Sequence, residues 1–126
     1  MRKEKYNMAT IEFYIKDQIH EIDTDKAYLI TVDNNLQELI PKGKSFTYKE
    51  VQEAIKPDCL IQPICLRYWT THRYHKKLNF ICDEEGMVNG SKLNTAASEL
   101  LQAILGPNAQ DLYGNIVITP NKLFRI

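Results

Sequence analysis

The sequence predicts a single domain of the α+β class, in which a mostly antiparallel sheet of about five or six strands packs with two helices. Two segments, residues 47–56 and 94–105, have apolar residues at helical spacing between recognisable start and stop residues. Short runs rich in β-branched and aromatic residues fill much of the remaining chain. These runs follow one another as hairpins instead of alternating with helices, which favours α+β over a parallel α/β sheet.

Three strands are expected near the N-terminus. Alternating apolar side chains in residues 11–15 and 19–22 predict a strand pair that turns at residues 16–18. Residues 27–32 are rich in β-forming side chains and predict a third strand. Asp and Asn favour turns, so we expect residues 33–35 to end this strand.

The first helix has the clearest start signal in the sequence. Thr47 can cap the helix, and Glu50, three residues later, can complete a capping box. Tyr48, Val51 and Ile55 recur at helical spacing. We expect the helix to end at residue 56, because the proline that follows disfavours helical backbone in the residue before it.

Two further strands, residues 60–66 and 78–82, are expected to pair as a long hairpin. Residues 68–76 would form a polar and aromatic connection between them. Pro63 lacks a backbone N–H, so its strand should lie at an edge of the sheet or contain a bulge.

The second helix is opened by Asn94 or Ser91 and ended by Gly106 and Pro107. A last strand at residues 115–119 closes the domain. The apolar face of the helix comprises Ala97, Leu100, Leu101, Ile104 and Leu105.

Length and composition indicate one folded domain over residues 1–126. A chain of 126 residues, 44% hydrophobic and 25% charged, is typical of a single globular core. No apolar run approaches the ~18 residues of a membrane span, and residues 1–8 lack a signal-peptide core. We therefore expect a cytoplasmic protein without a membrane partner. Residues 1–8 are expected to be disordered or to precede the native start, for which Met1 and Met8 are both candidates.

The three cysteines predict neither a disulfide nor a metal site. Cys59 and Cys65 are expected on one strand, about 20 Å apart, which is too far for a bond or a shared ion. With Cys82 they are expected to be buried, reduced thiols. The one conceivable metal cluster adds His72 and His75 to Cys65 and Cys82, and it lacks the C-x-x-C anchor that is usual for zinc. We predict no metal and no cofactor.

Strong catalytic signatures are missing from the sequence. The acidic turn at residues 83–86 is the remaining candidate for acid–base chemistry, together with His72 or His75. Adjacent carboxylates on a tight turn diverge, whereas a catalytic pair must converge across a cleft. A solvated turn in which Gly86 has a positive φ is the better interpretation. We expect no catalytic residue, and an enzyme with a non-standard site near residues 83–85 stays as an alternative.

The stretch 67–77 is the most informative for binding. The net charge is zero, but residues 59–82 contain four basic residues and no acidic one. In a nucleic-acid binder, aromatic rings stack on bases while cations pair with phosphates. Packing of the aromatic residues across a hairpin would explain the same composition, and we slightly favour it. The candidate ligand-binding residues are Arg67, Trp69, His72, Arg73, Tyr74, Lys76 and Lys77.

A series of short motifs occurs in a recognisable order between residues 30 and 118. The motifs are residues 36–38, 46–52, 60–66, 83–86, 93–97 and 113–117. This order resembles the uncharacterised bacterial and phage family known as domain of unknown function number 3846. The chain departs from the family at residues 56–58, where paired glycines are usual, and in its longer connection at 68–76. The resemblance implies a fold and a setting among phages, plasmids and their hosts, and it implies no activity.

These observations favour a non-catalytic binding or accessory protein of a phage, plasmid or bacterial host, acting on a protein or a ligand. The alternative is a nucleic-acid or nucleotide binder that uses residues 67–77, including a phage counter-defence protein that sequesters a nucleotide signal. Asn94 begins a helix, where an anion could bind. We expect it to cap the helix instead, because the acidic turn would repel an anion. The sequence carries no signal for the oligomeric state.

Overall fold

The elements along the chain confirm the α+β class. The computed structural model describes residues 10–69 and 75–125, and it describes only the backbone of residues 67–69, 75 and 76. Its elements are β1 (Thr10–Ile15), β2 (Gln18–Asp23), β3 (Ala27–Ile30), β4 (Leu36–Leu39), α1 (Tyr48–Ile55), β5 (Ile61–Trp69), β6 (His75–Asp83), α2 (Thr95–Leu105) and β7 (Ile116–Pro120).

Five strands form one antiparallel sheet in the order β4-β3-β7-β6-β5. The last strand of the chain, β7, lies at its centre, where Val117 pairs with Leu29 on one side and with Ile81 on the other. Strands β1 and β2 form a separate antiparallel hairpin. The expected pairing of β5 with β6 is confirmed, and so is the edge position that Pro63 requires.

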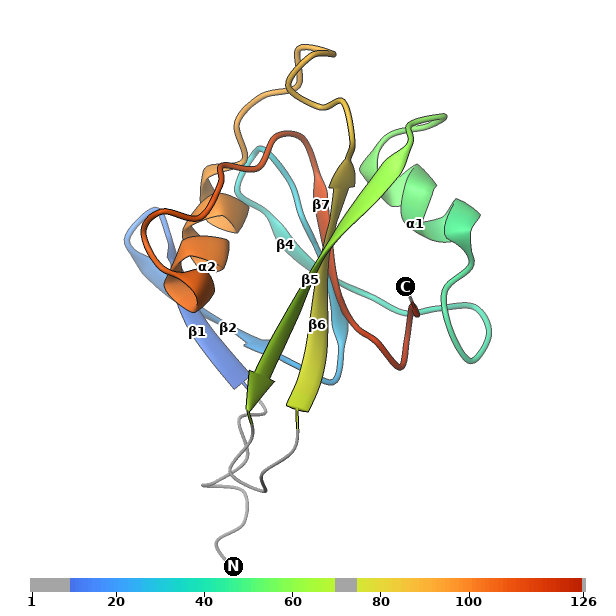
Figure 1. Cartoon of the computed structure of the whole chain (residues 1–126), viewed down its shortest axis with the longest axis horizontal. Coiled ribbons are helices and arrows are strands. Elements are labelled where there is room, and N and C mark those ends of the chain that lie inside the picture. The colour runs from blue at the N-terminus through green and yellow to red at the C-terminus, as the bar shows by residue number, and fades with distance from the viewer. Residues whose placement is uncertain (1–9, 70–74, 126) are drawn as a thin grey trace, which may run out of the picture.

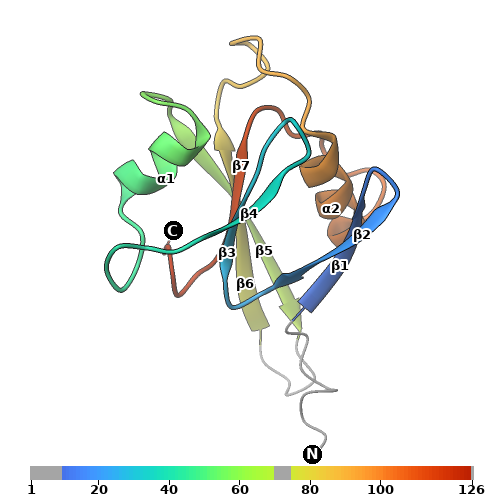
Figure 2. The same ribbon diagram turned by 180° about the vertical axis from the view of Figure 1, so that it is seen from behind.

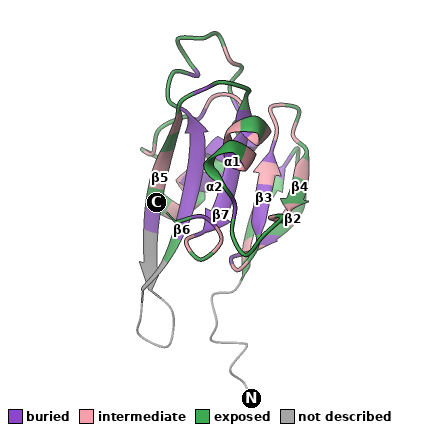
Figure 3. Cartoon of the chain, turned by 90° about the vertical axis from the view of Figure 1, so that its right-hand side faces the viewer, coloured by how far each residue is buried: buried purple, intermediate pink, exposed green. Residues whose placement is uncertain are grey.

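Both faces of the large sheet are covered (Figures 1 and 2). Helix α2 and the β1–β2 hairpin pack on one face, and α1 with the C-terminal segment packs on the other. Successive side chains of a strand point to opposite faces. On β6, for example, Phe80 belongs to the core under α2 and Ile81 to the core under α1. Figure 3 shows the result as buried central strands between more exposed edges.

Both helices begin as the sequence predicts. Thr47 Oγ1 accepts the backbone N–H of Glu50 at 3.2 Å, and Glu50 accepts the Thr47 N–H at 2.8 Å, which completes the capping box. These bonds lower the pKa of the Glu50 carboxyl. Asn94 caps α2, and Gly106 ends it with a φ of 112°.

The short strand β4 was not expected. Its residues, Leu-Gln-Glu-Leu, do not alternate between apolar and polar, so they lack the sequence pattern of a strand. Only the two leucines are partly buried. Pairing with β3 forms the strand instead. The predicted turn between β1 and β2 is confirmed: Lys16 and Asp17 have φ values of 50° and 67°, as a two-residue hairpin turn requires.

Candidate functional site

A pocket of about 350 Å³ lies at the end of the sheet where β6 ends and β7 begins. Figure 1 places this end at the top, with the loop that connects β6 to α2 above it. Four separated segments supply the walls: the residue Val32 just after β3, the end of α1, the end of β6 with the loop after it, and the entry to β7. The lining residues are Val32, Ile55, Lys56, Asp83, Asn89, Gly90, Ser91, Lys92, Gly114 and Asn115.

Asp83 organises the loop that forms one wall. Its Oδ1 accepts the backbone N–H of Glu85 at 3.0 Å, and its Oδ2 accepts Nδ2 of Asn89 at 3.4 Å. Its carbonyl accepts the N–H of Gly86 at 3.1 Å. The carboxylate is buried, with 6% of the residue exposed. Asp83 therefore holds its own loop with both carboxylate oxygens, rather than standing free in a solvated turn.

Glycine is required at residue 86 for a reason that differs from the predicted one. Positive φ values among the glycines of the described chain occur at Gly90, Gly106 and Gly114, so the expectation for Gly86 was wrong. A Cβ on Gly86 would lie 3.2 Å from the carbonyl oxygen of Tyr113. The constraint is a close approach between two backbone segments, which sequence spacing does not reveal.

Asn94 links three segments of the chain close to the pocket. Its Nδ2 donates to the carbonyls of Ile30 and Gly114, each at 2.9 Å, while its Oδ1 accepts the N–H of Ala97 at 3.0 Å. Asn115 adds a further link, since its Oδ1 accepts the N–H of Val32 at 3.3 Å. These bonds join β3, the start of α2 and the entry to β7.

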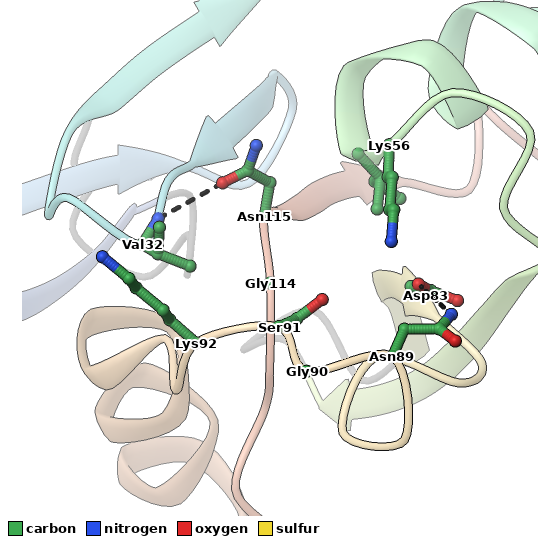
Figure 4. Close-up of a pocket in the computed structure, with 10 residues that line it drawn as sticks. Val32, Lys56, Asp83, Asn89, Gly90, Ser91, Lys92, Gly114 and Asn115 are labelled. Carbon is green, nitrogen blue, oxygen red and sulfur yellow. Dashed lines mark hydrogen bonds between the residues drawn. The ribbon is translucent and has the colours of Figure 1, made fainter.

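Four side-chain donors of the pocket are left without a partner in the described part of the chain. They are the ammonium groups of Lys56 and Lys92, the Ser91 hydroxyl and Nδ2 of Asn115. Asp83 is the one carboxylate among the lining residues. In Figure 4 the Lys56 side chain and the Ser91 hydroxyl point toward the space beside Asp83, and Lys92 extends on the opposite side, next to Val32. The pocket thus has a surplus of positive charge and of hydrogen-bond donors.

A second pocket, of about 460 Å³, shares Asp83 with the first and has the opposite charge. Glu84 and Asp111 line it as well, and neither lysine nor arginine is among its lining residues. Cys82, which also lines it, donates to the carbonyl of Gln62 at 3.6 Å. Burial, and secondarily the charge of Asp83, raises the pKa of this thiol. It is therefore a protonated, unreactive group at neutral pH.

Of the sequence-predicted binding residues, Arg67, Trp69, Lys76 and Lys77 lie on β5 and β6, and none of these four lines either pocket. Lys77 is exposed on β6, directly opposite Arg67 on β5, while Lys76 and Trp69 are placed by backbone only. His72, Arg73 and Tyr74 lie outside the described residues. His75 and Asp83 are the two ends of β6, eight residues apart, which corresponds to about 26 Å along a strand. His75 and the acidic turn are therefore too far apart to form one site.

Cys65 and Cys82, the two cysteines of the conceivable metal cluster that was weighed against buried thiols, do not converge. Residues that face each other in an antiparallel pair share a face, so Cys65 lies with Asn79 and Cys82 with Gln62, on opposite faces of the sheet. Cys65 is exposed, contrary to the expectation of a buried thiol, whereas Cys59 and Cys82 are buried as expected. The described residues contain no group of three or more His, Cys, Asp and Glu that could hold a metal ion.

Sequence reasoning missed Lys56, Ser91, Lys92 and Asn115 as site residues. They belong to segments that are far apart in the chain, and none forms a phosphate-loop motif. The one local signal was that Lys56 follows the first helix and Lys92 precedes the second.

Comparisons with protein-family models, curated proteins and solved structures find no match to this chain. The family resemblance therefore stays a prediction. None of the described helices is long and apolar enough to cross a membrane.

Proposed function

We propose that this is a non-catalytic binding protein that holds a small anionic ligand in the pocket between Lys56 and Lys92. The observation that supports the proposal is the set of four unpartnered donors around a single carboxylate. The two ammonium groups of the lysines outnumber the single carboxylate of Asp83. Both oxygens of that carboxylate already accept bonds, from Glu85 and Asn89. An anion would satisfy the free donors, and charge-assisted hydrogen bonds are the stronger ones in proteins.

A binding role fits this pocket better than a catalytic role does. Its ten lining residues include no histidine, cysteine or tyrosine. Asp83 supports the loop, and the thiol of the preceding residue, Cys82, lines the second pocket and has a raised pKa. Glu84 and Glu85 are exposed. The alternative of an enzyme with a site near residues 83–85 would have to work without a converging acid and base.

Titration calorimetry with inorganic phosphate at low salt tests the proposal. We expect the double variant Lys56→Ala, Lys92→Ala to weaken binding about tenfold or more, since it leaves the Asp83 carboxylate as the one charged group among the lining residues. The matched control, Lys44→Ala with Lys49→Ala, removes two exposed lysines that do not line this pocket. Equal phosphate affinity in the wild type and both double variants would reject the pocket as an anion site.

Nucleic-acid binding by the β5–β6 hairpin is a second candidate function. The observation that favours it is the register, which places Arg67 opposite Lys77. Residues directly opposite each other in an antiparallel pair lie on the same face of the sheet, and arginine and lysine cations pair with the phosphates of nucleic acids. If the hairpin binds single-stranded DNA, RNA or a cyclic nucleotide, the variant Arg73→Glu, Lys76→Glu should lose affinity, and the salt dependence should flatten by about one unit per cation removed. Equal affinity of the variant and the wild type would reject this function.

A further inference from the structure

The anion pocket is polarised between two different ends. At one end Lys92 extends past Val32, and Nδ2 of Asn115, whose oxygen bonds Val32, has no partner among the described residues. No carboxylate lines this end. At the other end the Lys56 ammonium faces Asp83, and the described residues show no ion pair between them. The first end has a net positive charge, while the charges of the second end cancel.

This polarity orients an anion. Coulomb repulsion from Asp83 disfavours a phosphate or carboxylate beside Lys56, whereas nothing opposes it at Lys92. The hydroxyl of Ser91 lies between the two ends, and Gly114 has no side chain to narrow the space beside it. A ligand that fills the pocket therefore places its anionic group near Lys92 and a different group near Asp83.

The ligand group near Asp83 must donate a hydrogen bond to the Asp83 carboxylate and accept one from the Lys56 ammonium. Each oxygen of Asp83 accepts one bond from the loop and retains a further lone pair, so it needs a donor. Lys56 carries three N–H donors and needs an acceptor. A hydroxyl both donates and accepts, and it can bridge the two. An ammonium group only donates, and it would be repelled by Lys56.

The size of the pocket limits the rest of the ligand. Its volume of about 350 Å³ lies at the lower end of the range of small-molecule sites, roughly 300–1,000 Å³. A phosphate has five heavy atoms and leaves room for a further small group. The remaining volume matches a small hydroxylated carbon chain or ring better than a whole dinucleotide.

From this geometry we infer that the ligand is a phosphate monoester of a polyol of about monosaccharide size, with its phosphate at Lys92 and a hydroxyl between Lys56 and Asp83. The inference rests on the proposed anion pocket. It adds the requirement that Lys56 and Asp83 select a hydroxylated phosphate ester over inorganic phosphate. The affinity for any anion comes mainly from Lys92.

Calorimetric comparison of four probes tests this assignment: inorganic phosphate, ribose 5-phosphate, ribose and phosphoethanolamine. We expect ribose 5-phosphate to bind at least about tenfold more tightly than inorganic phosphate, and phosphoethanolamine to show no such gain. Ribose alone should bind too weakly to detect. Phosphoethanolamine that binds as well as ribose 5-phosphate, or equal affinity for all phosphates, would overturn the inference but leave the anion pocket intact. Failure of every phosphate to bind would reject both.

Two single variants, each of which removes one exposed lysine, distinguish the roles of the two ends of the pocket. Lys56→Ala should remove the advantage of ribose 5-phosphate over inorganic phosphate, while Lys92→Ala should weaken both about equally. Both lysines are exposed, so neither change should unfold the protein. The reverse pattern, with selectivity lost in Lys92→Ala and retained in Lys56→Ala, would contradict the assigned orientation.

Discussion

The side-chain amide of Asn94 donates to the carbonyl of Ile30 at 2.9 Å, across 64 residues of sequence. The same nitrogen donates to Gly114, and the side-chain oxygen caps α2. Asn94 is fully buried, and each of its polar side-chain atoms has a partner. One residue therefore starts the second helix and also ties it to the strand end that borders the anion pocket.

Replacing Asn94 by alanine should cost about 3 kcal/mol of unfolding free energy. Loss of the cap contributes about 1 kcal/mol, and the carbonyls of Ile30 and Gly114 each lose a buried partner. Thr47→Ala is the matched control, because Thr47 caps α1 at an exposed site and should cost only about 1 kcal/mol. Denaturant titration measures both. Equal losses would show that the long-range bonds of Asn94 contribute nothing. Ligand affinity well below the melting temperature should be nearly unchanged.

Gly86→Ala should destabilise the loop above the pocket. The added Cβ would lie 3.2 Å from the Tyr113 carbonyl, and backbone atoms cannot move aside as a flexible side chain can. We expect a loss of about 1–2 kcal/mol, as for other overpacked positions. Gly43→Ala meets nothing within 4 Å and has no positive φ, so thermal unfolding should show it as neutral or slightly stabilising. A neutral Gly86→Ala would refute the close approach.

Unfolding free energy should fall at alkaline pH because two thiols are buried. Burial raises the pKa of Cys59 and of Cys82 above the ordinary value, with a smaller contribution from the charge of Asp83. Above about pH 8.5 the unfolded chain loses these protons while the folded chain keeps them, so the unfolded state gains stability. The slope can reach about 1.4 kcal/mol per pH unit for each thiol. In Cys82→Ala the slope should be shallower, and an unchanged slope would exclude the Cys82 thiol as its source.

The three cysteines should also differ in their rate of alkylation. Cys65 is exposed on the edge strand β5, whereas Cys59 and Cys82 are buried. Thiolates are the reactive form, and both access and pKa favour Cys65. Peptide mass analysis after brief iodoacetamide treatment of the native protein should find one labelled cysteine, Cys65. Early labelling of Cys82 would contradict its burial.

The predictable parts of the fold are those that local chemistry determines. Thr47 with Glu50, and Asn94 with Gly106, mark helix ends within a few residues of chain, so the sequence alone located both helices. The edge position of Pro63 follows in the same way from its missing N–H. Strand β4 has no such signal, because it forms only through pairing with β3.

The pocket could not be predicted, because its chemistry depends on distances between remote segments. Lys56 and Lys92 come to line one pocket only after β6, β7 and both helices are in place. The sequence offers Asp83 as a candidate, but its bonds to Glu85 and Asn89 depend on how the loop folds. The aromatic and basic stretch stands out by composition, which is a local signal, and its residues on β6, 75–77, lie at the opposite end of that strand from Asp83.

Chemical-shift mapping on ¹⁵N-labelled protein tests the anion pocket most directly. On addition of ribose 5-phosphate we expect the largest amide shifts at Gly90, Ser91, Lys92, Gly114 and Asn115, which line the pocket from two segments. Lys77, at the far end of β6, should not move. The same titration of the variant Lys56→Ala, Lys92→Ala should show greatly reduced shifts. Shifts centred on Lys77, or none at the pocket amides, would contradict the assignment of this pocket as the binding site.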